Sequence, residues 1–213
     1  MSPSLPSSAT RAPDEPLPIR LMNTLSVDRH GNLRDAFDDL DMVRSWVDIV
    51  GATCGLFPSR PTHDLASREE ADRLIALRNA IRRLAADHTD DPRTVGQSPI
   101  RRASAARKIV NDTSAMAHVW PELGTRAGVA RSRDMWAETS FTDALASLSA
   151  RRTIELITSP QWDDLQPCLA PSCAYFFLRD AVRRQWCAPA CGNRARVARH
   201  AQRHRADALA SGA

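Results

Sequence analysis

The feature that most constrains this chain is a cluster of cysteines near its C-terminal end. Four of the five cysteines follow the pattern Cys168-x4-Cys173-x13-Cys187-x3-Cys191, and the fifth, Cys54, stands apart. Two close cysteine pairs separated by a short spacer are typical of a tetrahedral zinc site, because each pair supplies two thiolates and the spacer returns the chain for the second pair. Soft thiolate sulfur selects zinc over magnesium or calcium. A segment of this size folds around its metal, because the free energy of binding becomes free energy of folding.

The spacing leaves alternatives open for these residues. The pairs depart from the common Cys-x2-Cys form, so iron–sulfur ligation is a second metal hypothesis. A redox dithiol is disfavoured because the reactive Cys-x2-Cys spacing is missing. His200 and His204 have the i, i+4 spacing that can ligate zinc and could replace one cysteine pair. We interpret Cys54 as a small buried apolar residue, with a redox or ligand role as the alternative.

The composition is that of a folded protein rather than a disordered one. The 213 residues are 43% hydrophobic and 25% charged. No apolar run approaches the roughly 20 residues that a membrane-spanning helix needs, and residues 1–18 lack the apolar core of a secretory signal. We therefore expect a cytoplasmic protein without a membrane partner, whose cysteines are reduced and not paired in structural disulfides.

Hydrophobic periodicity predicts a mainly α-helical chain. Amphipathic helices are expected over residues 35–50, 67–88, 99–116 and 140–158, and Gly51 is expected to end the first of them. Ser67 and Glu70 predict a capping box at the start of the second helix. The arginines of that helix, Arg73, Arg78, Arg82 and Arg83, are expected to form a solvated face. The other segments are expected to be a flexible tail (1–18), a short strand (19–25), a loop (26–33) and a small β-hairpin within 117–135.

These elements predict two domains. A multihelical N-terminal domain, with its small hairpin, is expected over residues 19–160, because its apolar stripes must face one another. A small C-terminal zinc finger that ends in a basic helix is expected over residues 161–207, followed by a tail over 208–213. The aromatic residues of the finger are expected to form its core, with stacking on nucleic-acid bases as the alternative. They are Tyr175, Phe176, Phe177 and Trp186.

Positive charge is concentrated in the same C-terminal segment. Residues 168–205 hold eight arginines and one aspartate, a net charge of +7, whereas the rest of the chain holds 21 basic and 24 acidic residues, a net charge of −3. Lys108 is the only lysine, so the use of arginine by itself is uninformative, but its clustering is informative. A basic end on an acidic body favours a polyanionic partner for that end.

A basic helix is expected after the last cysteine, over about residues 193–207, with Gly192 and Asn193 forming the turn into it. At 100° per residue, Arg196, Arg199, His200 and Arg203 share one side of this helix, where they could pair with phosphates. Contact with a protein, or with solvent alone, is the alternative. The candidate nucleic-acid contacts are Arg183, Arg184, Arg194, Arg196, Arg199 and Arg203. No residue of the helix is a clear base reader, so the sequence assigns no DNA site.

The residues around the cysteines resemble a known family. Trp186-Cys187-Ala188-Pro189-Ala190-Cys191-Gly192-Asn193-Arg194 resembles the signature of the CGNR zinc fingers, which are named for the tetrapeptide at 191–194. Residues 176–180 look like the aromatic stretch of that family, and residues 183–187 resemble its Arg-Arg-Trp-Cys, with Gln185 inserted. The resemblance implies that the four cysteines hold one structural zinc ion and that the module binds DNA.

The front of the chain also resembles a family. Leu21-Met22-Asn23-Thr24-Leu25, followed by the helix expected over 35–50, looks like the start of the ABATE domain. That domain accompanies CGNR fingers in bacterial proteins described as stress-induced transcription regulators. The resemblance implies a regulator whose helical domain senses a signal or binds a partner while the finger docks on DNA. The alternative is a protein-interaction module that contacts an acidic surface of the transcription machinery without binding DNA.

We do not expect an enzyme. Four thiolates leave zinc no open coordination position for a catalytic water, and no nucleophile–base motif or phosphate-binding loop is visible in the sequence. Four scattered histidines form no recognisable ligand cluster, and three aspartates look like a solvated helix face; these are His30, His63, His88 and His118, and Asp38, Asp39 and Asp41. A thiol-based stress sensor, in which oxidation ejects zinc and releases DNA, is compatible with the regulator hypothesis.

Overall fold

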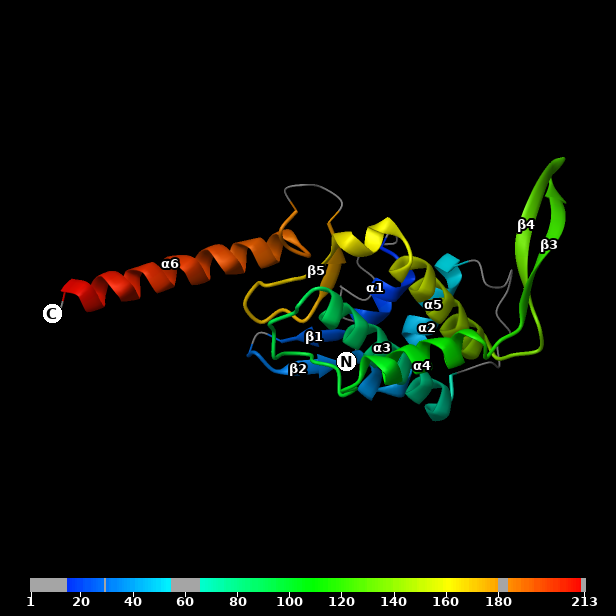
Figure 1. Ribbon diagram of the computed structural model, residues 1–213, viewed down its shortest axis with the longest axis horizontal. Coiled ribbons are helices and arrows are strands. Elements are labelled where there is room, and N and C mark those ends of the chain that lie inside the picture. The colour runs from blue at the N-terminus through cyan, green and yellow to red at the C-terminus, as the bar shows by residue number, and fades with distance from the viewer. Residues whose placement is uncertain (1–14, 29, 55–65, 180–183, 212–213) are drawn as a thin grey trace.

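A computed structural model describes residues 15–28, 30–54, 66–179 and 184–211. Within these residues the chain has the mainly α-helical fold that we expected, with small antiparallel hairpins. The elements are α1 (Leu17–Met22), β1 (Leu25–Val27), β2 (Leu33–Asp35), α2 (Leu40–Cys54), α3 (Arg68–His88), α4 (Ala103–Ser114), β3 (Val119–Arg126), β4 (Val129–Trp136), α5 (Phe141–Ile157), β5 (Leu165–Pro167), β6 (Phe176–Leu178) and α6 (Pro189–Ser211). A helical body occupies the centre, and the β3–β4 hairpin and α6 project from opposite ends of it (Figure 1).

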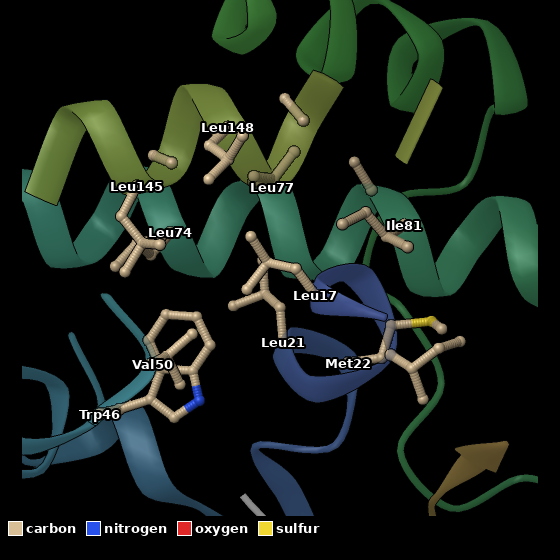
Figure 2. Packing of buried hydrophobic residues seen from close by; sticks show 14 of the residues in the cluster. Leu17, Leu21, Met22, Trp46, Val50, Leu74, Leu77, Ile81, Leu145 and Leu148 are labelled. Atoms are coloured by element: carbon tan, nitrogen blue, oxygen red, sulfur yellow. The ribbon is translucent and has the colours of Figure 1, made fainter. Parts of the chain in front are cut away.

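The short helix α1 is the buried centre of the body. All six of its residues are buried. Figure 2 shows Leu17, Leu21 and Met22 of α1 beneath the apolar side chains of α3, with α5 on the far side of α3 and Trp46 of α2 closing one flank. The residues of α2, α3 and α5 that complete this cluster include Trp46, Val50, Leu74, Leu77, Ile81 and Leu145, each with no exposed surface. Apolar area removed from water on this scale is the main force that holds helices together.

Three expectations for the front of the chain are wrong. The described part of the expected tail, from residue 15, already enters α1 at Leu17, and residues 19–25 form a helix and the start of a strand rather than one strand. Pro18 lies at the second helical position, where its fixed φ suits the first turn. The loop expected over 26–33 is a hairpin, because Leu25–Val27 pairs antiparallel with Leu33–Asp35. Residues 1–14 lie outside the described part of the chain.

Helix α2 begins and ends later than the sequence predicts. It starts at Leu40, after a 3-10 turn over Ala36–Asp38, and it continues through Gly51 to Cys54. Gly51 does not end the helix, because its role is steric. The ring of Phe141, from α5, lies where a β-carbon at residue 51 would stand. The glycine therefore allows α5 to approach α2 closely, an effect that no local pattern could have indicated.

The capping box expected at the start of α3 is confirmed. The Ser67 hydroxyl accepts a hydrogen bond from the Glu70 amide at 3.2 Å, and the Glu70 carboxylate accepts one from the Ser67 amide at 2.6 Å, which completes the capping box. Ser140 caps α5 by accepting from the Asp143 amide at 3.0 Å. The Ser140 hydroxyl also donates to the Glu70 carboxylate, so one carboxylate joins the first turns of both helices.

The solvated arginine face expected on α3 is wrong. Arg78 and Arg82 are each only 2% exposed. Arg78 forms an ion pair with Asp35 at 2.5 Å, and the Arg82 guanidinium donates to backbone carbonyl oxygens. Arg73 is partly buried against Asp143, at 2.9 Å. These charges lie inside because each has a fixed partner, which is the condition for burying a charge.

The β3–β4 hairpin confirms the expected hairpin and extends it to Trp136. At its tip Ala127 has φ +52° and Gly128 has φ +76°. Two successive positive φ values define the type I′ turn that suits the twist of a two-residue hairpin loop. A third pair, β5 with β6, carries the chain into the cysteine cluster. No helix in the described ranges is both long and apolar enough to cross a membrane.

Candidate metal centre

The structure brings the four clustered cysteines together. The sulfur atoms of Cys168, Cys173, Cys187 and Cys191 all lie within 4.8 Å of one another. Three Sγ–Sγ distances are 3.7 Å for Cys173–Cys187, 3.4 Å for Cys187–Cys191 and 3.9 Å for Cys173–Cys191. Sulfurs at about 2.3 Å from a tetrahedral zinc lie about 3.8 Å apart, so the spacing fits this ion. The four thiol donors and their spacing make this a site for one structural zinc ion.

The first cysteine pair lies on the turn between β5 and β6. The Cys168 amide donates to the Tyr175 carbonyl at 2.9 Å, which continues the strand pairing past Pro167 and narrows the turn. Ser172 has φ +54°, so the chain reverses through the left-handed region just before Cys173. Both cysteines are buried, and the turn presents their sulfurs together.

The second pair lies at the start of α6. The helix begins at Pro189, earlier than the expected 193, so Cys191 lies in its first turn and Gly192 and Asn193 are helical rather than a turn into the helix. Amide groups at a helix N-terminus favour thiolate charge. The Arg194 guanidinium also contacts the Cys191 sulfur at 3.1 Å. Both interactions stabilise a negatively charged ligand at this end of the site.

The closeness of the four sulfurs shifts the pKa values of the cysteines in opposite directions. The pKa of Cys168 is lowered far below its usual value, because hydrogen bonds from the side chains of Cys173, Cys187 and Cys191 favour its thiolate. The pKa of Cys187 is raised far above its usual value, first by the interaction with Cys168 and then by the other two sulfurs and burial. The pKa of Cys191 is lowered and that of Cys173 is raised, so without a cation the cluster ionises only in part. A divalent metal ion removes this limit, because each ligand binds it as a thiolate.

Three of the four aromatic residues expected in the core of the finger pack against the cysteines: Phe177, which is 1% exposed, and the half-buried Tyr175 and Trp186. The fourth, Phe176, is also 1% exposed but belongs to the core of the helical body. Burial on this scale leaves the two phenylalanines no free face for stacking on a base. Gly192 is adjacent to the indole of Trp186, which a β-carbon would approach to 3.0 Å. The glycine of the tetrapeptide therefore makes room for Trp186.

The candidate nucleic-acid arginines divide into two groups. Arg184 is half-buried and donates to the Cys187 carbonyl at 3.2 Å, and Arg194 contacts a ligand sulfur, so both have structural contacts near the metal. Arg196, Arg199 and Arg203 are exposed along α6. Arg183 lies outside the described residues. Contact with nucleic acid is a prediction for all six arginines.

The histidine alternative for the metal is not supported in the described part of the chain. The Nε2 atoms of His200 and His204 lie 3.1 Å apart on the exposed surface of α6. The only group of three or more ligand side chains found among the described residues is the cysteine cluster itself. Cys54 is half-buried at the end of α2, and burial raises the pKa of its thiol.

The sequence reasoning missed a set of contacts between the helical body and the first cysteine pair. Arg93 donates to the Tyr175 carbonyl at 2.8 Å, Arg82 donates to the Ala174 carbonyl at 3.0 Å, and Asn23 bonds both backbone groups of Phe176. One signal was available for Arg82, since it lies eight residues after Leu74 on a face shared with Leu74 and Ile81. Arg93 and Asn23 had no local signal.

Comparison with protein families agrees with this architecture. Residues 15–160 match the model of the ABATE family, described as "Putative stress-induced transcription regulator". Residues 165–204 match the model of the CGNR zinc finger. The comparison with curated proteins gives no match. The first match covers more than half of the 213 residues, and the second covers all four clustered cysteines.

Proposed function

This chain belongs to the ABATE family, and from that membership we propose that it is a transcription regulator that docks helix α6 on duplex DNA. The proposal rests on how α6 is attached at one end and exposed along the rest of its length. Its N-terminal turn is attached to the zinc site, and the rest of the helix extends away from the body into solvent (Figure 1). A helix of 23 residues is roughly 35 Å long, and the major groove admits a helix.

The charge on α6 matches the partner. Arg196, Arg199 and Arg203 are exposed on one side of the helix, so they can pair with phosphates without a change of fold. Phosphate contacts position a protein on DNA and release bound counterions, which makes affinity fall with salt. The proposal thus rests on electrostatic capture with α6 in or beside a groove. It assigns no base contacts and no DNA sequence.

The proposal gives zinc a structural role and no catalytic one. Four cysteine ligands complete a tetrahedral shell, which leaves no position at which the metal could activate water. The chemistry of the donor set therefore favours a binding protein over an enzyme. In this proposal the cysteines fix the first turn of α6, and the arginines of α6 supply the positive charge that binds DNA.

A salt series of DNA binding tests the proposal. The zinc-loaded full chain and its Arg199→Ala/Arg203→Ala variant would be titrated with fluorescent duplex DNA at several salt concentrations. We expect the variant to bind more weakly, with its log–log salt slope smaller by about 2, because each lost phosphate contact removes about 0.9 from the slope. Zinc content should stay the same, because neither arginine touches the cysteines.

The matched control is Arg101→Ala/Arg102→Ala, which removes two exposed arginines from the helical body. This control should bind DNA with almost the wild-type slope. Equal losses in both double variants would show a non-specific effect of net charge, and an unchanged slope in the α6 variant would reject docking through α6.

A protein partner is the second candidate, because Val197 is 70% exposed in the middle of α6. An apolar side chain among arginines is typical of a helix that contacts an acidic protein surface. Zinc-loaded protein that fails to bind DNA even at low salt would favour this candidate.

A further inference from the structure

The two cysteine pairs belong to different parts of the molecule. Cys168 and Cys173 lie on the β5–β6 turn, which packs against the helical body, whereas Cys187 and Cys191 lie at the start of the projecting helix α6 (Figure 1). The described contacts of the first pair with the body are several and buried. On the second side, Arg184 forms an ion pair with Glu15 at 3.6 Å.

Arg93 is the centre of the contacts on the first side. Its side chain is 7% exposed and forms an ion pair with Asp91, which is 8% exposed, at 2.6 Å. The two Asp91 oxygens hold Nε and Nη2. Nη1 is thereby directed at the cysteine turn, where it donates to the carbonyls of Tyr175 at 2.8 Å, Cys173 at 3.4 Å and Cys168 at 3.5 Å. One guanidinium thus touches the backbone of both ligands of the first pair.

Arg82 and Asn23 extend the same attachment. Arg82 Nη2 bridges the Ala174 carbonyl at 3.0 Å and the Gly96 carbonyl at 2.7 Å, and it has no carboxylate partner among these contacts. The Asn23 side chain donates to the Phe176 carbonyl at 2.9 Å and accepts from its amide at 3.0 Å. Burial of Arg82 without a carboxylate is costly. The ring of Phe176 partly compensates, since Arg82 and Arg93 lie over it with their Cζ atoms at 5.2 Å and 4.6 Å from its centroid.

We propose that Arg93, oriented by Asp91, and Arg82 are positioning residues of the zinc site: they hold the Cys168–Cys173 turn in its ligating shape as part of the helical body, before the metal binds. The site is therefore half preformed. Cys187 and Cys191 would complete the ligand set when zinc is bound, and α6 would thereby be attached to the body. The inference goes beyond the proposed function and does not depend on DNA binding, because it concerns the metal site alone.

Zinc affinity of the full chain tests the proposal. The zinc-loaded protein would be titrated with a chromophoric chelator, and the dissociation constant obtained by competition. Groups that orient metal ligands from outside the coordination shell change metal affinity by about 10- to 100-fold when removed. We expect Arg93→Ala to weaken zinc binding by about this factor.

Arg73→Ala is the matched control. It also removes a partly buried arginine that holds a carboxylate with two hydrogen bonds, but its partner is Asp143, and it touches nothing in the cysteine turn. It should destabilise the helical body and leave zinc affinity almost unchanged. The proposal would be overturned if Arg93→Ala bound zinc like the wild type, or if Arg73→Ala lost as much affinity as Arg93→Ala.

Two further measurements keep the proposal testable if Arg93→Ala does not fold. Arg93→Lys keeps the charge but cannot hold Asp91 with two nitrogens and also reach Tyr175, so we expect a smaller loss of zinc affinity in a folded chain. In the zinc-free wild type, hydrogen exchange should still show protection of the Cys168 and Phe176 amides, which bond Tyr175 and Asn23. Exchange of these two amides at unfolded rates, while α3 stays protected, would show that the turn is not preformed.

Discussion

Glu70 connects two helices whose N-termini lie far apart in the sequence. Its carboxylate accepts hydrogen bonds from the Ser67 amide and from the Ser140 hydroxyl, which is 70 residues away. Burial by itself would raise the pKa of Glu70, but the hydrogen bonds from Ser140 and Ser67 and the charge of Arg73 outweigh burial, so the pKa is lowered. The ionised form is therefore the one that the folded chain stabilises.

The first prediction at the residue scale concerns pH. A carboxyl whose folded-state pKa is lowered stabilises the fold above its unfolded pKa, about 4.3 for glutamate, and this contribution is lost as the pH falls through the folded-state value. Glu70→Gln should therefore cost about 1.5–3 kcal/mol at pH 7, the usual contribution of a hydrogen bond to a charged group. The cost should shrink at pH values below about 4. Denaturant unfolding of the wild type and the variant at pH 7 and at pH 3 measures this difference in the free energy of unfolding.

Glu69→Gln is the control, since Glu69 is 85% exposed and forms only a surface pair with Arg73. A surface pair of this kind contributes about 0–1 kcal/mol, so Glu69→Gln should cost less than Glu70→Gln at pH 7. If Glu70→Gln cost the same at pH 7 and pH 3, the carboxylate charge would not be the source of the stability.

At the scale of elements, the β3–β4 hairpin is the least supported part of the body. Among the residues that the structure describes, its strands pair only with each other, and Leu123 is 81% exposed. A two-stranded hairpin is marginally stable in water by itself. Its tip contains Ala127 at φ +52°, a conformation that costs an L-residue with a β-carbon about 1–2 kcal/mol.

Ala127→Asn should stabilise the hairpin, because asparagine tolerates positive φ and Asn-Gly is the preferred pair in a type I′ turn. We expect the free energy of local opening to rise by about 1 kcal/mol. Hydrogen exchange of the β3–β4 ladder amides measures this opening directly. Ala130→Asn, one residue into β4, is the control and should not slow hydrogen exchange of these amides. If exchange slowed in both variants, the backbone conformation at the tip would not be the cause.

Elements that depend on local chemistry could be predicted from the sequence, and those that depend on distant partners could not. Ser67 and Ser140 cap helices through bonds to residues three positions away, so α3 and α5 were placed almost to the residue. Gly51 was misread as a helix end because the Phe141 ring, from another helix, determines its role. Helix α1 was misread as a strand because six residues are too few to show a helical period.

The same distinction applies to the metal site. The ligands were predicted because their residue type and spacing are themselves the signal, and the structure brings all four together. The burial of the arginines was not predicted, because the sequence alone does not distinguish a buried arginine with a carboxylate or carbonyl partner from a solvated one. Arg82 was expected in solvent and is buried against the cysteine turn, while Arg196 was expected in solvent or on DNA and is exposed.

At the scale of the whole molecule, the direction of α6 depends on the metal. The helix starts two residues before Cys191 and projects from the body with its arginines in solvent (Figure 1). Bound zinc would connect the first turn of α6 to the turn between β5 and β6, which is packed against the helical body. Loss of zinc should therefore free α6 while the helical body keeps its fold, because the body core contains none of the four ligands.

Limited trypsin digestion tests this separation. We expect chelation to accelerate cleavage after Arg184 and Arg194, which contact the Cys187 carbonyl and the Cys191 sulfur in the closed site. The helical body should resist further digestion, with α1–α4 and α5 as two fragments once the hairpin tip between them is cut. Cleavage after Arg126, at the exposed hairpin tip, serves as the internal control and should proceed at the same rate with and without zinc. If chelation accelerated cleavage throughout the body equally, zinc would hold the entire fold rather than the attachment of α6. In that case the arginine helix and the helical domain could not be treated as parts joined through one metal ion.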